Sequence, residues 1–118
     1  MGLTSHYYTP EEANRLLPEI RKIVSEIVEA KKELGWLQSG FKRNECMDEL
    51  ASLISKLEEK GIELKDMDAG LVDFPAKRFD QEVYLCWKLG EQQILYWHEI
   101  QTGYAGRKLL RPEPLKAR

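Results

Sequence analysis

The chain has 118 residues, of which 42% are hydrophobic and 32% are charged, and its formal net charge is −2 at pH 7. These values are typical of one soluble globular domain, and they exclude a disordered chain, a collagen-like repeat and a pair of domains. No apolar run approaches the roughly 20 residues that a membrane-spanning helix needs, and the N-terminus does not resemble a secretion signal. We therefore expect a cytoplasmic protein without a membrane partner, in which the two cysteines, Cys46 and Cys86, are free thiols.

The sequence Thr-Pro-Glu-Glu at 9–12 predicts the start of a helix, because its threonine and second glutamate can form a capping box and proline suits the first helical position. Apolar residues then recur at spacings of three and four, which predicts one long amphipathic helix. Pro18 lacks the N–H that would bond to the carbonyl of Asn14, so we expect a kink or an early break there. The recurring apolar residues are Ala13, Leu16, Leu17, Ile20, Ile23, Val24, Ile27, Val28 and Leu34.

Glycines and a serine interrupt this pattern at 35–40, and Asn44 is a candidate N-cap for a second helix. The predicted end of that helix is Lys60, because the following Gly61 is of the type that terminates many helices. The short connection predicts that residues 9–60 form an antiparallel helical hairpin with one long and one shorter arm. The predicted buried stripe of the second helix is Met47, Leu50, Ala51, Leu53, Ile54 and Leu57.

The long arm of this hairpin extends past the shorter one, so part of its apolar stripe from Ile20 to Leu34 needs a cover. The C-terminal half or a second chain could provide it. Our leading functional hypothesis is therefore a self-associating binding or scaffold protein, a homo-oligomer such as a homodimer, in which the hairpins pack as a bundle.

After Gly61 the period of the apolar residues changes from about 3.6 to about 2, which predicts strands. Three segments fit this pattern: 70–75, which Pro75 should end, 82–89, and 94–100. Because no helix intervenes, we expect a three-stranded antiparallel meander over residues 70–100, covered on one face by the hairpin. The predicted fold class is α+β.

Residues 101–118 form a basic tail, in which five Lys or Arg residues and one Glu give a charge of +4. Pro112 and Pro114 favour an extended arm in this tail. A cationic arm can bind phosphates. The whole chain is acidic, however, and it contains no nucleic-acid-binding motif, so we do not expect a nucleic acid as its partner.

Strand periodicity also predicts which side chains share a face of the sheet. Tyr84 and Cys86 point to one face of their strand, and Tyr96 and His98 share a face of the next. Two registers remain open, because a loop with one residue more or less exchanges the faces. One register places Cys86 opposite Tyr96 and Tyr84 opposite His98, whereas the other brings Leu85 opposite Tyr96.

Four residues of this half, Asp73, Cys86, His98 and Glu99, carry side chains that bind zinc or another divalent cation. They lack the fixed spacing of a metal motif, so a site requires the fold to gather three segments. The alternative function is a divalent-metal-binding protein or a metal-dependent hydrolase with Asp73, His98 and Glu99 at its centre. In that case Arg107 could contact an anionic substrate.

Under a purely structural interpretation, His98 donates to a tyrosine or to a backbone carbonyl, and Glu99 forms an ion pair with Arg107 or Lys88. Two further candidates carry weaker signals. The carboxylates at 66 and 68 lack the other ligands of a calcium loop, so we expect a solvated turn there. Cys46 has no histidine nearby in sequence, and we expect it to be inert.

Six segments have the character of family motifs. They are Tyr-Thr-Pro-Glu-Glu-Ala-Asn at 8–14, Gly-Ile-Glu-Leu-Lys-Asp at 61–66, Gly-Leu-Val-Asp-Phe-Pro at 70–75, Val-Tyr-Leu-Cys-Trp-Lys-Leu-Gly-Glu at 83–91, Tyr-Trp-His-Glu at 96–99 and Gly-Tyr-Ala-Gly-Arg at 103–107. In these segments the chain resembles the uncharacterised prokaryotic family called domain of unknown function 2203. The resemblance extends over nearly the whole chain, and it implies no established reaction or ligand.

Overall fold

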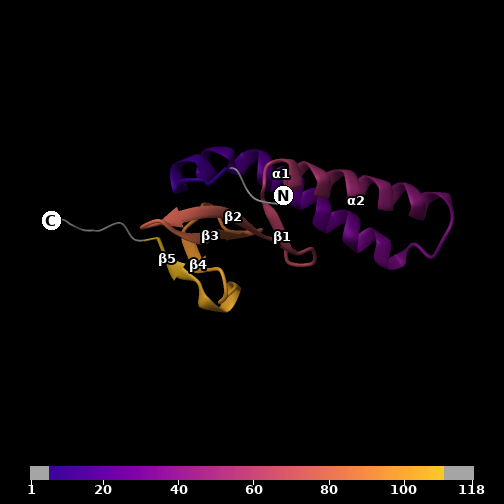
Figure 1. Ribbon diagram of the computed structural model, residues 1–118. Coiled ribbons are helices and arrows are strands. Elements are labelled where there is room, and N and C mark those ends of the chain that lie inside the picture. The colour runs from indigo at the N-terminus through magenta and orange to yellow at the C-terminus, as the bar shows by residue number, and fades with distance from the viewer. Residues whose placement is uncertain (1–5, 111–118) are drawn as a thin grey trace.

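The computed structural model describes residues 6–110, which form two helices followed by one five-stranded antiparallel sheet (Figure 1). The elements are α1 (Pro10–Trp36), α2 (Phe41–Glu59), β1 (Glu63–Asp66), β2 (Leu71–Arg78), β3 (Gln81–Lys88), β4 (Tyr96–Glu99), the 3-10 helix η1 (Tyr104–Gly106) and β5 (Lys108–Leu109). The strands lie in the sheet in chain order. The predicted α+β class is confirmed. None of the helices in residues 6–110 is apolar over a length that could cross a membrane.

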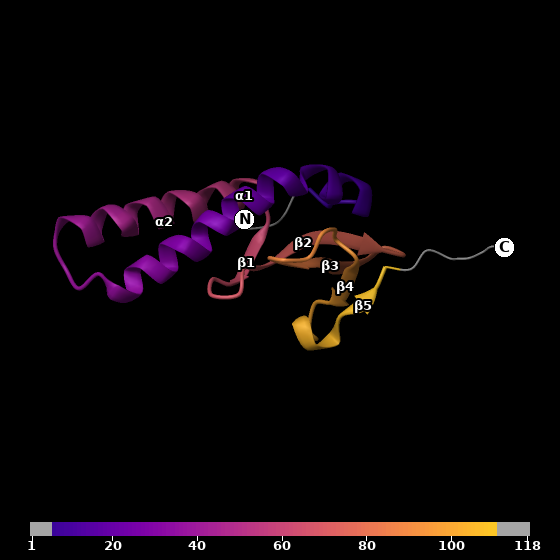
Figure 2. The ribbon, with the colours of Figure 1, turned by 180° about the vertical axis from the view of Figure 1, so that it is seen from behind.

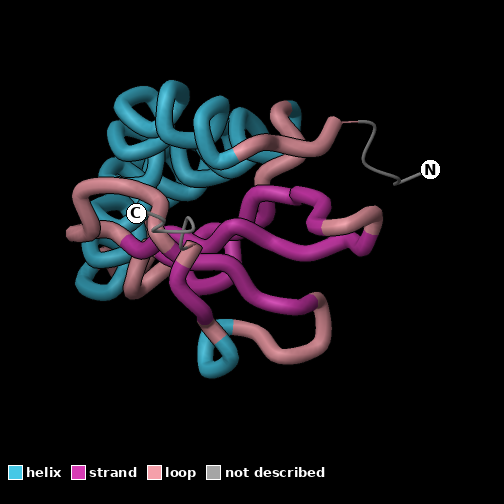
Figure 3. Tube along the Cα trace, turned by 90° about the vertical axis from the view of Figure 1, so that its left-hand side faces the viewer, coloured by secondary structure: helices cyan, strands magenta, loops and turns pink. Residues whose placement is uncertain are grey.

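The helices and the C-terminal segment lie on opposite sides of the sheet. The first half of α1 lies over the sheet, and the second half of α1 and α2 project beyond it side by side (Figures 1 and 2). Figure 3 shows η1 on the side of the sheet that faces away from the helices. We call this side the outer face. The helices therefore cover one face of the sheet and leave the outer face to be covered by other residues.

The first helix begins as the sequence predicts. The N–H of Glu12 donates to Oγ1 of Thr9 at 3.0 Å, and the N–H of Thr9 donates to the carboxylate of Glu12 at 3.1 Å, which completes the capping box. α1 then continues through Pro18 without the break that we considered. Its neighbours Leu17 and Ile20 are buried in the core, and this packing offsets the lost backbone hydrogen bond.

The second helix begins earlier than predicted. Its N-cap is Gly40, not Asn44, and the backbone of Gly40 has φ +96°, a conformation that glycine adopts at little cost. The longer α2 helps to cover the apolar stripe of α1. The core-facing residues of this stripe between Ile20 and Val28 are at most 8% exposed. Of the two covers that the sequence left open, the C-terminal half or a second chain, these residues need no second chain, because they are buried within the described part of this one. In α2 the predicted core residues Met47 and Ala51 are exposed.

The sheet has five strands rather than the predicted three. β1 lies where the sequence predicted the beginning of a turn, and its pairing with β2 places Glu63 opposite Asp73. β5 comes from the predicted basic tail and places Lys108 opposite Trp97. These strands contain four and two residues, too few for a period of two to be recognised. Residues 111–118 of the predicted extended arm lie outside the described residues.

Strand β2 continues through Pro75 to Arg78, whereas the sequence predicted that Pro75 would end it. The N–H and the carbonyl of a strand residue point to the same side. The carbonyl of Pro75 accepts from the N–H of Tyr8 at 2.7 Å, so the nitrogen of Pro75 points to that side as well and away from β3. β1 pairs with β2 only as far as Asp73, so no strand of the described chain lies on the side to which the nitrogen of Pro75 points. Proline is tolerated at this position because no strand hydrogen bond from its nitrogen is needed.

One of the two open registers is confirmed. Cys86 pairs with Tyr96 and Tyr84 pairs with His98. Residues 89–95 connect β3 to β4, an odd number, as this register requires. Tyr84, Cys86, Tyr96 and His98 therefore share one face of the sheet.

Replacement of Trp87 by alanine tests the core that the helices and the sheet share. The side chain of Trp87 is fully buried, and its indole N–H donates to the carbonyl of Glu91 at 2.9 Å. We expect Trp87→Ala to lower the free energy of unfolding by about 3–5 kcal/mol, measured by urea denaturation with circular dichroism. Trp36→Ala is the matched control, because Trp36 is 74% exposed, and it should change the free energy by less than about 0.5 kcal/mol. A loss below about 1 kcal/mol for Trp87→Ala would contradict this core.

Candidate metal centre

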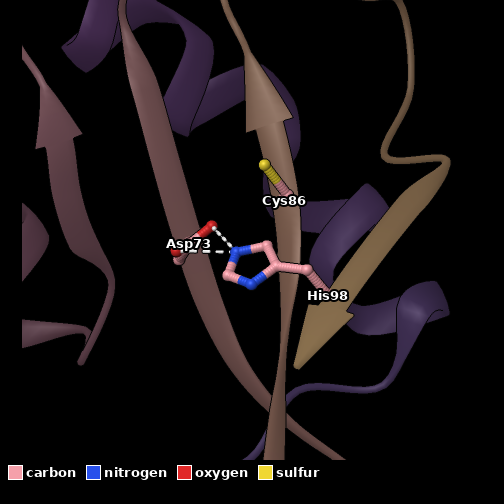
Figure 4. Close-up of side chains that lie close together, drawn as sticks. All are labelled: Asp73, Cys86 and His98. Carbon is pink, nitrogen blue, oxygen red and sulfur yellow. Dashed lines mark hydrogen bonds and ion pairs between the residues drawn. The ribbon is translucent and has the colours of Figure 1, made fainter. Parts of the chain in front are cut away.

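Three of the four predicted metal ligands come together on neighbouring strands. Asp73 of β2, Cys86 of β3 and His98 of β4 each offer a donor atom, and these atoms all lie within 4.8 Å of one another (Figure 4). The register brings them together, because Asp73 lies opposite Cys86, and His98 lies opposite Tyr84, two residues before Cys86. The three residues are at most 2% exposed.

The cluster lies on the outer face of the sheet. The neighbours of these residues along the strands, such as Val72, Phe74 and Leu85, belong to the core that includes the helices. Because side chains alternate between the faces, Asp73 and Cys86 must point away from the helices. The three donors are thus buried without any contribution from the helical layer.

Glu99, the fourth predicted ligand, is not part of the cluster. It lies opposite Val83, a core residue, and it follows His98 directly in β4, so it points to the opposite face of the sheet. The carboxylate of Glu99 instead lies 3.6 Å from Nζ of Lys108. This partner also differs from the two that the structural interpretation named, Arg107 and Lys88.

The hydrogen bonds of His98 fix how its ring can bind a proton or a metal. Nδ1 lies 2.7 Å from the carbonyl oxygen of Glu99, and Nε2 lies 3.1 Å from each carboxylate oxygen of Asp73. A carbonyl oxygen can only accept, so Nδ1 must carry a proton and donate it. In a neutral ring Nε2 is then an unprotonated acceptor that faces the carboxylate. The contact between Nε2 and Asp73 therefore needs a proton, or another cation, between the two groups.

Burial governs the ionisation of the other two members. Removal from water raises the pKa of Asp73, and the charge of His98 is the largest effect that opposes this rise. Burial, followed by the negative charge of Asp73, raises the pKa of Cys86 to about 12. Without a cation, Cys86 is therefore a neutral thiol at pH 7. A bound metal ion would reverse this preference, because a coordinated thiol loses its proton.

Arg107 lies beside the cluster, but it is not open to a substrate as the sequence suggested. One guanidinium nitrogen donates to the carboxylate of Glu91 at 2.7 Å and lies 3.4 Å from the carbonyl of Cys86. The ring of Tyr96 lies 3.9 Å from the guanidinium carbon. The charge of Arg107 is therefore neutralised by Glu91 within the chain.

Two features of the surroundings were missed by sequence reasoning. Glu91 accepts from Arg107 and from the backbone of Lys88, and the hydroxyl of Tyr84 donates to the carboxylate of Glu63 at 2.6 Å. The contacts of Glu91 depend on how residues 89–95 fold, and the contact between Tyr84 and Glu63 depends on strand β1. Neither segment has a periodic pattern that could have predicted these contacts.

The two weaker candidates lie in ordinary structural surroundings. Asp66 accepts from the backbone N–H groups of Asp68 and Ala69, as in an Asx turn, and Asp68 pairs with Lys31 at 2.8 Å. Cys46 is buried between the helices and its thiol lies 3.4 Å from the carbonyl of Ala30, and burial raises its pKa. Neither group offers a second site.

The donor set fits a divalent transition metal. Imidazole nitrogen, thiolate sulfur and carboxylate oxygen are the ligands that zinc binds in proteins. The hydrogen bond from Nδ1 to the Glu99 carbonyl is also the arrangement that orients a metal-binding histidine, because it leaves Nε2 with a free lone pair directed at Asp73.

Comparison with known proteins identifies the family. Residues 36–110 match the family DUF2203, which is described as an uncharacterized conserved protein, and the chain belongs to this family. The matched range contains Asp73, Cys86 and His98. No curated protein and no solved structure matches the chain.

Replacement of His98 tests the electrostatics of the cluster. We expect His98→Ala to lower the free energy of unfolding by about 3–5 kcal/mol near neutral pH, because it leaves the buried carboxylate of Asp73 without its partner. The variant also loses the charge that opposes the raised pKa of Asp73, so this pKa rises further. The folded variant then binds more protons than the unfolded chain, and its stability should fall as the pH rises from the ordinary aspartate pKa of 3.8 toward neutral pH.

Urea denaturation at several pH values measures this effect. His6→Ala is the control, because the side chain of His6 is 54% exposed, and we expect it to cost less than about 1 kcal/mol at every pH. A His98→Ala variant whose stability rises over this pH range would contradict a buried, unpartnered Asp73.

Proposed function

We propose that this member of the DUF2203 family binds one divalent transition-metal ion, for which zinc is the best fit, through Asp73, Cys86 and His98. The observation that carries the proposal is the convergence of three different donor atoms within 4.8 Å in a buried cluster. Structural metal sites commonly join strands that would otherwise hold few apolar contacts, and all three ligands come from different strands of the sheet.

The charge of the cluster supports the proposal. A buried ion is costly unless its charge is compensated. A divalent cation, with charge +2, would be neutralised by the carboxylate of Asp73 and the thiolate of Cys86, each with charge −1, while His98 binds as a neutral ring. The bound site would therefore carry no net charge. The bound ion would also take the place of the proton that the contact between Nε2 of His98 and the carboxylate of Asp73 otherwise needs.

Metal binding is better supported than metal-dependent hydrolysis. The predicted Glu99 points to the other face of the sheet, and the three proposed ligands are at most 2% exposed, so a substrate could not reach them in this conformation. The ion would stabilise the fold, since the unfolded chain does not hold the donors together. Its thiolate ligand requires a reduced cysteine, which suits the cytoplasmic location that we propose.

Metal titration of the untagged, reduced protein tests this function. We expect one equivalent of Zn²⁺ to bind, and Co²⁺ to give a thiolate charge-transfer band in the near ultraviolet. His98→Ala and Cys86→Ser should each weaken binding by at least about tenfold, because each removes a ligand. Binding should also raise the midpoint of thermal unfolding.

The chain offers matched controls for both ligands, because it has only two histidines and two cysteines. His6→Ala and Cys46→Ser should bind Zn²⁺ as the unaltered protein does. Glu99→Gln should also bind normally, because Glu99 faces away from the cluster. Binding of less than about a tenth of an equivalent, or equal loss of binding in the two cysteine variants, would exclude the proposed site.

We further propose that the protein self-associates through the end of its helical pair, as a homodimer in the simplest case. Large apolar side chains gather at the connection between the helices: Trp36 and Phe41 are 74% and 75% exposed, and Met47 is 48% exposed. This end projects away from the sheet (Figure 1). Exposed apolar groups of this size are typical of a contact surface. A second copy could bury the same residues in a symmetric interface.

Light scattering at micromolar concentration tests self-association. We expect the unaltered chain to be larger than a monomer, and Trp36→Lys combined with Phe41→Lys to be monomeric, because charged side chains resist burial. Phe79→Lys is the control, because Phe79 is equally apolar and 94% exposed but lies in the β2–β3 turn. A strictly monomeric unaltered protein would exclude this proposal.

A further inference from the structure

We infer that Arg107 holds the segment of residues 100–110 closed over the metal cluster and thereby controls access to Cys86. We call residues 100–110 the covering segment. It contains η1, which lies on the outer side of the sheet to which the cluster points, and β5, which is the edge strand beside β4 (Figure 3). The inference about metal exchange depends on the proposed function, whereas the inference about access to the thiol does not.

The side chain of Arg107 joins the covering segment to β3, to β4 and to the loop between them. Its guanidinium donates to Glu91 at 2.7 Å and lies 3.4 Å from the carbonyl of Cys86. It also lies between two tyrosine rings, 3.9 Å from the centre of Tyr96 and 4.6 Å from that of Tyr104. Tyr96 is the residue opposite Cys86 in the sheet. Arg107 therefore packs over the strand positions that carry the thiol.

The rest of the covering segment is mostly exposed. η1 contains no buried residue, and both residues of β5 are exposed. Ile100, Tyr104 and Leu109 are 47%, 44% and 58% exposed. Outside Arg107, the segment is held by the short β5 pairing, by the ion pair of Lys108 with Glu99, and by Leu110, which packs partly buried against the core. Segments with few buried contacts open without global unfolding.

The closed conformation is also incompletely paired. Nε of Arg107 is buried and has no hydrogen-bond partner among the described residues. A buried donor without a partner favours the conformation in which water can reach it. This unpaired donor therefore favours opening of the covering segment, while the contacts of Arg107 with Glu91 and with the Tyr96 ring oppose it.

This arrangement separates access to the cluster from unfolding of the core. Cys86 is fully buried, and Arg107, which lies against the backbone of Cys86, belongs to the mostly exposed covering segment. Cys46 is also buried, but between the two helices. The two thiols should therefore respond to different motions: Cys86 to opening of the covering segment, and Cys46 to separation of the helices.

The rate of thiol alkylation by iodoacetamide, followed for each cysteine by mass spectrometry, tests the inference in the metal-free protein. We expect Arg107→Ala to accelerate modification of Cys86 by at least about tenfold, because it removes the charge-assisted hydrogen bond to Glu91 and the contact with the Tyr96 ring, which join the segment to the sheet. Modification of Cys46 should not change. Lys108→Ala is the comparison variant, because it removes the ion pair that joins the same segment to Glu99 on the other face but leaves the groups beside Cys86 in place, so it should accelerate modification of Cys86 less than Arg107→Ala does.

A milder variant covers the case in which Arg107→Ala does not fold. Glu91→Gln removes the charge partner of Arg107 but keeps an oxygen to accept from the backbone of Lys88, and it should accelerate modification of Cys86 alone by a smaller factor. Equal acceleration of both cysteines would show that the variants loosen the whole fold, and it would overturn the inference. Unchanged modification of Cys86 in both variants would also overturn it.

The zinc-loaded protein provides the second measurement. Transfer of Zn²⁺ to an excess of EDTA should be faster in Arg107→Ala than in Lys108→Ala. If Zn²⁺ binds but neither its release nor the alkylation of Cys86 responds to Arg107→Ala, the inference is wrong and the proposed function stands. If no Zn²⁺ binds, the proposed function fails, and the alkylation rates still decide whether Arg107 controls access.

Discussion

The contact between His98 and Asp73 constrains the whole outer face of the sheet. Both ring nitrogens of His98 face acceptors, the carbonyl of Glu99 and the carboxylate of Asp73, and the pair is almost fully buried. Such a buried contact is stable only if a proton or another cation lies between Nε2 and the carboxylate. The helices do not cover this pair, because they lie on the opposite side of the sheet. The cluster therefore needs cover from residues of the outer face, where the Tyr84 ring lies beside His98 and Arg107 of the covering segment lies against the backbone of Cys86.

This requirement explains why the C-terminal segment turns back onto the sheet. A sheet with one covered face often leaves the other face polar and solvated. Here the outer face carries buried titratable groups at Asp73, Cys86 and His98 instead. Arg107 adds a cation to this face, and Glu91 neutralises it. The outer face is therefore a second, polar interior, and its stability depends on the pairing of charges more than on apolar area.

The features that could be predicted from sequence were those with a local physical cause. The start of α1 followed from the capping box, and the faces of β3 and β4 followed from the period of two. Sequence patterns therefore identified Asp73, Cys86 and His98 correctly as residues that could meet. The inclusion of Glu99 ignored the same rule, since adjacent residues of a strand point to opposite faces. Strands β1 and β5 could not be predicted, because short pairings depend on their neighbours and not on their own composition.

The register of β4 shows where sequence reasoning reaches its limit. The loop of residues 89–95 decides whether Cys86 faces Tyr96, and it also places Glu91 next to Arg107. Its conformation is held by contacts from distant parts of the chain: Asn14 of α1 bonds to the backbone N–H of Ile94 at 2.7 Å, and Trp87 donates to the carbonyl of Glu91. A helix at one end of the sequence therefore fixes the loop that aligns the cluster. The helical layer and the polar outer face are thus coupled through this loop, although they lie on opposite sides of the sheet.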